Sequence, residues 1–547
     1  MSLDRLISTV EDRRVPMADT QLHMARVPSI VGSKSRMLRT WGWTTFGEYW
    51  NHVQDLDGAL YAQGAEVSQR NQNQTISALV DYEDPYVQPL ILDALASRLP
   101  PDSYTLIKSL DEHVGEPRPL LQFRAYESID FDKAVDSPNS MINAYVIRKA
   151  LIRKHYLSTT IANWIVKHPD SILKSHVKPS VDFELDYAEF LDDALVEAFD
   201  LRESFSRNDS KEPQDREWWI LKPGMSDRGQ GIRLFSTEEE LQSIFEEWEA
   251  ERPDSEVDED SDSETEEAHE KRPSEGELNA TIRAEANGID SSDARSDATA
   301  TPITPFSPAT TSGGNMKFPD FPKNDVKTEQ KDYIITSQLR HFIAQPYIDP
   351  PLTFDGRKFH IRTYVVAVGA LKVFVYRPML ALFAAAPYSP PWAADEQDLR
   401  AHLTNTCIQG SDGREGSVRA FWDLPDDAAP LQKGWKDTVF SQICAVTGAA
   451  FEAAARGMMI HFQPLPSAFE LFGVDFMVDE RGDAFLLEIN AFPDFRQTGD
   501  ELQGLVRGLM EEVVDVAFKP FFGIEDGAKP DGDEQCVKCL DIDLGRR

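Results

Sequence analysis

The chain has 547 residues, which is enough for three or four domains of roughly 100 to 200 residues each. Its composition, with 41% hydrophobic, 10% aromatic and 27% charged residues, is typical of a soluble globular protein with an added acidic part. The formal net charge of −37 argues against duplex nucleic acid as the main partner, because phosphate backbones are bound by basic surfaces.

The sequence shows no sign of membrane insertion or secretion. No run approaches the roughly 18 to 20 apolar residues of a membrane span, and charges stand where a secretion signal needs an apolar stretch. Four cysteines do not make a disulfide framework, and the C-x-x-C at Cys536 and Cys539 lacks the second pair or nearby histidine that would complete a zinc site. We expect a soluble, cytoplasmic monomer that binds no membrane, with the cytoskeleton or cytoplasmic granules as alternative locations.

The N-terminal part divides into two segments. Residues 1–75 have no clear periodicity and stay unassigned. In 76–141, ISALVD at 76–81 predicts a strand, 85–98 a helix that begins with proline, and 104–108 a second strand. This order predicts a small α/β domain.

The segment 144–157 predicts one basic helix. Its apolar residues have helical spacing, which brings Arg148, Lys149, Arg153 and Lys154 near one another. These cations favour an anion-binding surface, and a solvated helix face is the alternative.

The acidic segment 251–330 separates two ordered regions. It contains PDSEVDEDSDSETEEAHE and few large apolar residues, so it is expected to be disordered. It interrupts a central subdomain, 142–344. A C-terminal subdomain, 345–524, then contains a hairpin over 358–376, a strand pair over 469–490 and a helix over 500–518, and 525–547 is expected to be a flexible tail.

Strand alternation places three basic residues on one face of the hairpin. In KFHIR, Lys358, His360 and Arg362 point one way, while Phe359 and Ile361 point toward the core. Cations on such a face are suited to phosphate, although a solvated outer face of a sheet remains possible.

The strand pair carries oxygen ligands. Glu488 and Asn490 share one face of LLEIN, and Asp475 on the preceding strand can face them. Two carboxylates and an amide oxygen are suited to Mg²⁺ that takes its other ligands from water and phosphate.

A third element is WWILKPG, an apolar strand that ends in Lys222 and precedes the glycine-containing loop 226–231. Its lysine and loop amides can meet phosphates, although the loop lacks the P-loop order and an ordinary turn is the alternative. The three elements together predict a nucleotide held between two sheets.

Six ordered motifs resemble those of the tubulin-tyrosine ligase-like family, most closely its fungal branch: WILKP…GQGI, QPYIDPPL, GRKFHIR, HLTN, FELFGVDFMVD and LLEIN. The resemblance covers about 144–518 apart from the insert. It implies an α+β ATP-grasp fold in which two α/β subdomains clamp ATP. It also implies a Mg²⁺-dependent reaction in which a carboxylate is phosphorylated and the acyl phosphate is attacked by an amine.

The resemblance also implies residue roles. Lys222, Arg362 and Glu488 would be catalytic, and Asp475, Glu488 and Asn490 would bind Mg²⁺. The nucleotide contacts would be Lys149, Lys222, Arg228, Gly229, Gly231, Gln345, Tyr347, Ile348, Lys358, Arg362, Thr404 and Asn405.

Two positions depart from the family pattern. His360 replaces an acid in KFDIR, and Leu382 replaces an arginine expected near the γ-phosphate. The leading hypothesis is a ligase that joins a free amino acid, of the tyrosine or glutamate class, to a protein carboxylate such as the tubulin tail. The two departures and the long acidic insert favour an alternative, an ATP-binding scaffold with little or no ligase activity. A ligase for a small metabolite is a third hypothesis.

Overall fold

The computed structural model describes residues 75–113, 118–224, 229–250, 340–393, 398–404, 417–428, 430–499, 502–524 and 535–544. The chain divides into two units, one of Met1–Arg70 with Gly545–Arg547 and the other of Asn71–Leu544. Every described residue belongs to the second unit. The unassigned segment before residue 75 and the acidic insert 251–330 lie outside the described residues.

The N-terminal domain is a small parallel sheet. Its strands are β1 (Ile76–Asp81), β2 (Tyr104–Ile107), β3 (Leu120–Arg124) and β4 (Ser140–Ile142), in the order β2-β1-β3-β4. Helices α2 (Gln88–Arg98) and α3 (Phe131–Asp136) belong to the same domain. The predicted strand–helix–strand unit is confirmed, and the helix begins three residues later than expected because Pro85 lies in the preceding turn.

The central sheet is antiparallel, with strands β5 (Val181–Glu184), β8 (His341–Pro346), β6 (Trp219–Pro223) and β7 (Arg233–Phe235) in that order. Helices η4 (Ala188–Phe190), α7 (Leu191–Ala194), α8 (Phe199–Asn208) and α9 (Glu238–Ala250) supply residues of its hydrophobic core. Along β6, Trp219 and Leu221 are buried in this core while Ile220 and Lys222 point the other way. The predicted division at 344/345 falls inside β8, and it stays a prediction.

The C-terminal sheet is built around the long strand β10 (Arg357–Val368). It pairs with β9 (Thr353–Phe354), β11 (Lys372–Tyr376), β12 (Leu380–Phe383) and β14 (Phe469–Val478), and β14 continues to β15 (Ala484–Ala491). Strand β13 (Val418–Ala420) extends the sheet beyond β12. Both predicted strand pairs are therefore present.

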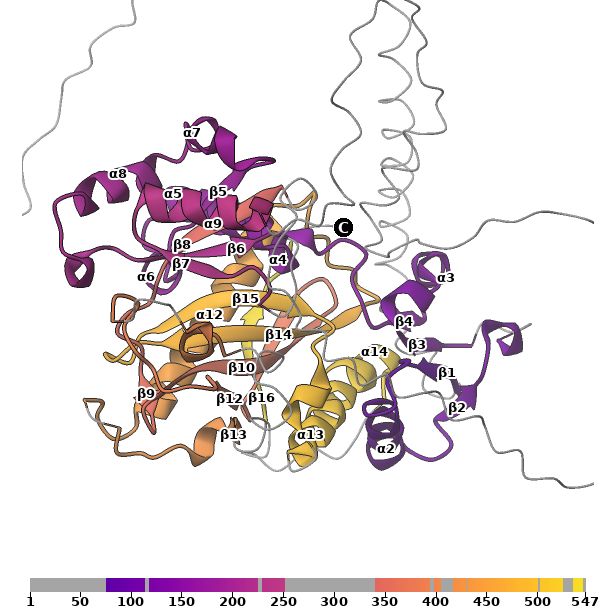
Figure 1. Ribbon diagram of the computed structural model, residues 1–547. Coiled ribbons are helices and arrows are strands. Elements are labelled where there is room, and N and C mark those ends of the chain that lie inside the picture. The colour runs from indigo at the N-terminus through magenta and orange to yellow at the C-terminus, as the bar shows by residue number, and fades with distance from the viewer. Residues whose placement is uncertain are drawn as a thin grey trace, which may run out of the picture. The chain divides into compact units, whose positions relative to one another are not determined.

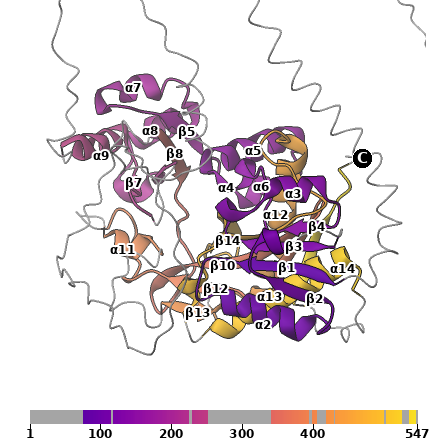
Figure 2. The same cartoon turned by 90° about the vertical axis from the view of Figure 1, so that its right-hand side faces the viewer.

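Two helical layers cover this sheet. Helix α12 (Trp435–Gly457) contributes to one hydrophobic core, and α13 (Gln503–Val513) contributes to the other. The chain continues from α13 through a short π-helix (Val514–Phe518) into α14 (Lys519–Phe522). The N-terminal sheet lies beside α13 and α14, with α2 against α13 (Figures 1 and 2).

Helix α12 is the one helix in the described part of the chain that is long and apolar enough to cross a membrane. About 61% of its most apolar window is buried inside the protein, and its Val439, Ile443 and Phe451 are fully enclosed in the core. Burial of this kind is typical of the central helix of a folded domain.

The single basic helix predicted over 144–157 is wrong. The structure has α4 (Lys149–Ile152) and α5 (Lys154–Lys167), with Arg153 extended between them at φ −102° and ψ 123°. Residues 144–148 precede the helix because the Tyr145 amide donates to Glu470 Oε2 at 3.0 Å and the Tyr145 side chain is fully buried.

The flexible tail predicted over 525–547 is also wrong in part. Residues Cys536–Asp541 form β16, which pairs antiparallel with β11 at the edge of the C-terminal sheet. Cys536 packs into one hydrophobic core and Cys539 against the other, so the two thiols face opposite sides of the sheet. This arrangement argues against a shared zinc ion.

Candidate functional site

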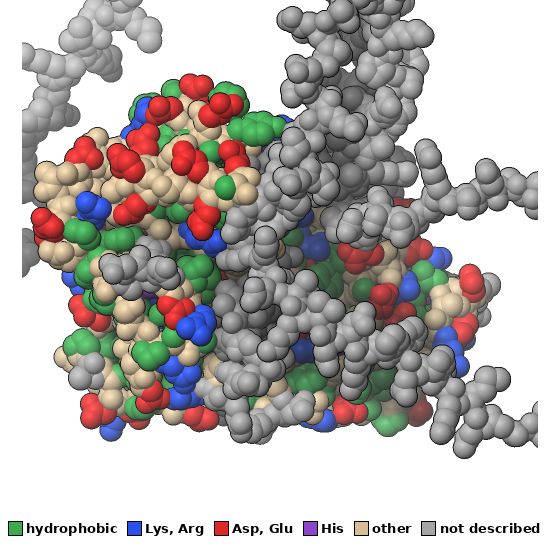
Figure 3. Space-filling model, viewed as in Figure 1, with side chains coloured by type: hydrophobic (Ala, Val, Ile, Leu, Met, Phe, Trp, Pro, Cys, Tyr) green, Lys and Arg blue, Asp and Glu red, His purple; other side chains and the backbone are tan. Residues whose placement is uncertain are grey.

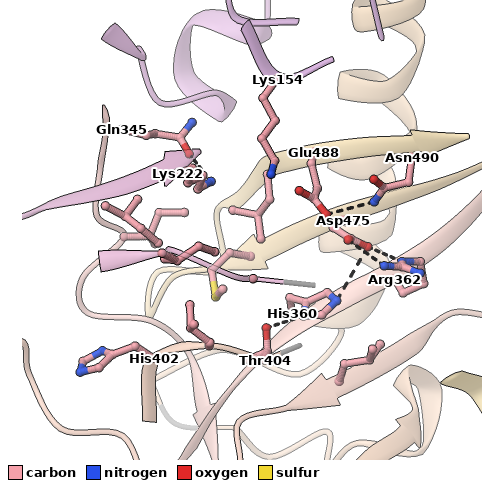
Figure 4. Close-up of a pocket in the computed structure, with 18 of the residues that line it drawn as sticks. Lys154, Lys222, Gln345, His360, Arg362, His402, Thr404, Asp475, Glu488 and Asn490 are labelled. Atoms are coloured by element: carbon pink, nitrogen blue, oxygen red, sulfur yellow. Dashed lines mark hydrogen bonds and ion pairs between the residues drawn. The ribbon is translucent and has the colours of Figure 1, made fainter. Parts of the chain in front are cut away.

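A cavity of about 460 Å³ lies between the central and C-terminal sheets. This is the size of a small-molecule site. Its polar wall comes from β6, β8, β10, β14, β15, the start of α5 and the segment after α11 (Leu399–His402) (Figure 4). The polar residues that line it are Arg153, Lys154, Lys222, Gln345, Tyr347, Lys358, His360, Arg362, His402, Thr404, Asp475, Glu488, Asn490 and Asp494.

Arg362 and Asp475 form a two-pronged ion pair at the floor of the cavity. They are register neighbours on β10 and β14, and Arg362 Nε and Nη2 donate to the two carboxylate oxygens of Asp475, the second at 2.9 Å. Gly473 makes room for this arginine, because a Cβ there would lie 3.3 Å from Arg362 Cδ and 2.9 Å from Pro493 Cβ. The pair fixes the guanidinium beside the acidic residues.

Glu488 and Asn490 extend this floor on β15. Glu488 is the register neighbour of Asp475, and Asn490 Nδ2 donates to Glu488 Oε1 at 3.0 Å. Burial by itself raises the pKa of Glu488, but the charge of Lys154, the Asn490 hydrogen bond and further cations lower it to about 2. Glu488 is therefore an anion at neutral pH.

The chemistry of this donor set fits Mg²⁺. Glu488 supplies an ionised carboxylate, Asn490 an amide oxygen that is not used in its bond to Glu488, and Asp475 a neighbouring carboxylate. The described residues hold no cluster of three or more His, Cys, Asp and Glu side chains of the kind that encloses a metal. Mg²⁺ needs only one or two carboxylates when water and phosphate complete its shell.

Two lysines also line the cavity, Lys222 on β6 of the central sheet and Lys358 on β10 of the C-terminal sheet. Lys222 Nζ donates to Gln345 Oε1 at 2.9 Å, and burial, opposed by Glu488, lowers the Lys222 pKa to about 8. Lys358 Nζ donates to the Tyr347 hydroxyl at 2.8 Å, and that oxygen lies 2.9 Å from His402 Nδ1. Burial, together with the charge of Lys222, lowers the Lys358 pKa to about 7. A bound polyanion would stabilise both ammonium groups.

The two positions that depart from the family pattern are neighbours. His360 on β10 and Leu382 on β12 are register partners, and both line the cavity. His360 Nδ1 lies 2.5 Å from Thr404 Oγ1, and Nε2 lies 3.8 Å from Asp475 Oδ1. Burial lowers the pKa of His360, so the imidazole is neutral at physiological pH. Leu382 adds an apolar side chain to the same wall.

Most predicted site residues line the cavity. These are Lys222, Gly229, Gln345, Tyr347, Ile348, Lys358, Arg362, Thr404, Asp475, Glu488 and Asn490. Gly231 is described but does not line the cavity, and Arg228 and Asn405 lie outside the described residues.

Lys149 is exposed and does not line the cavity, whereas Lys154 does. Arg148 is withdrawn from the predicted basic group, because its Nε pairs with Glu470 at 2.9 Å and its guanidinium lies over the Tyr126 ring. The sequence analysis therefore missed the role of Lys154, and it also missed His402. Lys154 belongs to the basic group that the sequence did reveal, while His402 carried no signal beyond its place in HLTN.

Comparison with known proteins gives a consistent result. The profile of the tubulin-tyrosine ligase family matches residues 152–523. A probable tubulin–tyrosine ligase of Schizosaccharomyces pombe is 39% identical over 448 residues, covering 82% of this chain and 92% of that protein. The probable tubulin–tyrosine ligase PBY1 of Saccharomyces cerevisiae is 38% identical over 491 residues, which is 86% of this chain but 56% of that protein.

Among solved structures, the C-terminal domain of K. lactis Pby1 is similar to this chain with a TM-score of 0.56 and 30% identity. The match covers 86% of this chain and 99% of that one. That protein is described as an ATP-grasp enzyme that interacts with the mRNA decapping enzyme Dcp2.

Proposed function

Because the chain belongs to the tubulin-tyrosine ligase family and has the ATP-grasp fold, we propose that it is a Mg·ATP-dependent ligase that joins an amino acid to a protein carboxylate. The reaction would pass through an acyl phosphate of the acceptor, which the amine of the amino acid then attacks. The amino acid that is joined would be of the tyrosine or glutamate class.

The convergence of acids and cations in one cavity carries this proposal. Lys222 comes from the central sheet, while Lys358, Arg362, Asp475 and Glu488 come from the C-terminal sheet. Such a set neutralises a triphosphate and one metal ion together, which is the task of an enzyme that transfers a phosphoryl group.

Each residue has a distinct part in this reaction. Lys222 and Lys358 would bind phosphate oxygens, and Arg362 would stabilise the charge that develops on the transferred group. Glu488, Asn490 and Asp475 would hold Mg²⁺, which would neutralise phosphate charge. Gln345 fixes Lys222, and Tyr347 fixes Lys358, so both cations are placed before the nucleotide arrives.

The acceptor is proposed from the family and from the relatives. The tubulin C-terminal tail is the family's usual acceptor, and the K. lactis relative interacts with Dcp2, so a component of mRNA decapping is a second candidate partner. Both partners favour a cytoplasmic location. Because the chain spans 56% of the budding-yeast protein, the activity and partners of that whole protein come to this chain only as proposals.

The test is the rate of ADP release with ATP, Mg²⁺, an amino acid and a panel of protein acceptors. Glu488→Gln removes the anion that would hold the metal, so we expect release to fall by more than about 100-fold. Glu480→Gln changes an exposed glutamate outside the cavity in the same hairpin and should leave the rate unchanged. Equal ADP release by both variants would remove Glu488 from the reaction.

A second candidate function is a nucleotide-binding scaffold with little ligase activity. The apolar Leu382 beside the neutral His360 favours it, since the family has an arginine and an acid at these positions. ATP binding without ADP release across the acceptor panel would support the scaffold. Incorporation of a labelled amino acid into any protein tail would exclude it.

A further inference from the structure

The segment 187–201 of the central subdomain has apolar residues both in the core and on the surface. Leu191, Leu195 and Leu201 point into the core beneath the central sheet. Phe190 and Phe199 nevertheless expose 47% and 74% of their surface. Single exposed hydrophobic residues are normal, but a cluster of large ones on one segment is typical of an interaction site.

Exposed carboxylates stand next to these apolar side chains in the sequence. We call the surface the acidic ridge, and it consists of Tyr187, Phe190, Val196 and Phe199 with the exposed acids Glu189, Asp192, Asp193, Glu197, Asp200 and Glu203. Asp and Glu side chains gather over α7 and α8 with hydrophobic side chains among them (Figure 3). Arg202 pairs with Asp192 at 3.2 Å and Arg207 with Glu203 at 3.0 Å, so the remaining acids leave the ridge strongly negative.

At one edge of the acidic ridge, neighbouring carboxylates repel one another. The pKa of Glu238, in the first turn of α9, is raised by burial, then by a hydrogen bond with Asp192 and by the charge of that residue. Neighbouring carboxylates that disfavour each other's ionisation indicate a negative local potential. A cation brought to this edge would relieve the repulsion.

Charge decides which occupant suits the ridge. A second copy of the chain would bring the same negative surface, and the stretch PDSEVDEDSDSETEEAHE is acidic as well. Anionic lipid and nucleic acid are repelled for the same reason. The occupant must therefore supply both positive charge and apolar side chains.

We propose that the acidic ridge docks a basic amphipathic segment of another protein, in which Lys or Arg flank apolar side chains. The exposed phenylalanine rings bury the apolar side chains and supply most of the affinity, since aromatic residues dominate binding energy at interfaces. The surrounding carboxylates attract the segment and fix its orientation. This docking is independent of the reaction in the cavity, because the ridge residues do not line it.

The test measures binding of defined peptides to the full chain by fluorescence anisotropy. An amphipathic Lys–Leu peptide is compared with a Lys–Ser peptide of the same length and charge. We expect the Lys–Leu peptide to bind at least about tenfold more tightly, and Phe190→Ser with Phe199→Ser to remove that difference. Both substitutions are on the surface, so melting temperature checks that the variant is folded.

Two controls separate the ridge from general attraction to an acidic protein. Ile460→Ser removes another side chain that is 77% exposed, on the turn after α12, and should leave binding unchanged. Glu197→Lys with Asp200→Lys should weaken binding of both peptides. Equal affinity for the two peptides, equal losses with Ile460→Ser, or a dimer in sedimentation that the phenylalanine substitutions dissociate would each overturn the proposal.

Discussion

Lys358 shows how the cavity prepares for an anion. Its side chain is buried beside Tyr347, and burial with the charge of Lys222 lowers its pKa from 10.5 to about 7. At pH values between about 7 and 10.5, the folded chain binds fewer protons than the unfolded chain. The free energy of unfolding therefore rises with pH across this range, and the stability present above about pH 10.5 is lost as the pH falls toward 7.

Phosphate beside this amine should raise its pKa again, so ATP binding near pH 8 is expected to take up protons. Titration calorimetry in two buffers with different ionisation enthalpies measures the number taken up. Lys358→Met should take up fewer protons than the unchanged protein, with the remainder due to Lys222. The same uptake in both proteins would show that Lys358 does not meet the phosphates.

The sequence was a good guide to residues on strands. Alternation alone placed Lys358, His360 and Arg362 on one face, and all three line the cavity. Contacts between distant residues were beyond it. The local sequence gives no signal that Lys358 contacts Tyr347, whose hydroxyl contacts His402. It likewise gives no signal that Arg148 pairs with Glu470.

At the scale of elements, the break between α4 and α5 determines which lysine enters the cavity. The apolar spacing of 144–157 is that of one helix, and no glycine or proline marks the interruption. Burial of Ala144 and Tyr145 keeps these residues out of the helix. The extended Arg153 then begins a new helix, whose first residue, Lys154, faces Glu488 (Figure 4).

The break between α4 and α5 predicts a role for Lys154 in ATP binding that the family resemblance does not imply. Lys154→Gln should weaken ATP binding by about tenfold, because one cation near the triphosphate is lost. Lys149→Gln, a matched change on the exposed side of α4, should have no effect. Titration of both variants with ATP measures the difference. A loss confined to Lys149→Gln would restore the assignment made from the sequence.

Strand β16 was missed because its residues follow a polar, glycine-containing stretch that is typical of a tail. Its pairing partner, β11, lies more than 150 residues earlier in the chain. Only the tertiary structure shows that the edge of β11 is available.

Deletion of 535–547 should lower the free energy of unfolding by at least about 3 kcal/mol, because a row of strand hydrogen bonds and the burial of Cys536 are lost. Deletion of 545–547 alone is the control and should change little. Urea denaturation compares the two. Equal stability of the shortened chains would show that β16 is dispensable.

At the scale of the whole molecule, the acidic insert is expected to contribute little to the stability of the fold. It joins α9 to β8, and both elements are anchored in the central core without it. Loop closure changes by only about 0.6 kcal/mol for each twofold change in loop length. Deletion of 251–330 should therefore leave the melting temperature nearly unchanged, and a large decrease would show that the insert is structural.

The fold brings together residues that are far apart in the sequence, from Lys154 on α5 to Asn490 on β15. The central sheet supplies Lys222, and the C-terminal sheet supplies Arg362 and Glu488. The C-terminal sheet thus has both acids and cations, and the central sheet adds a further cation for a metal–triphosphate complex. We therefore expect both sheets to contact one nucleotide.

The most direct test is a crystal structure of the full chain with Mg²⁺ and a non-hydrolysable ATP analogue. Our account predicts Mg²⁺ at about 2.1 Å from oxygens of Glu488 and Asn490, with the phosphates in contact with Lys222, Lys358 and Arg362. A nucleotide bound elsewhere, or a metal ion held without Glu488, would contradict the account.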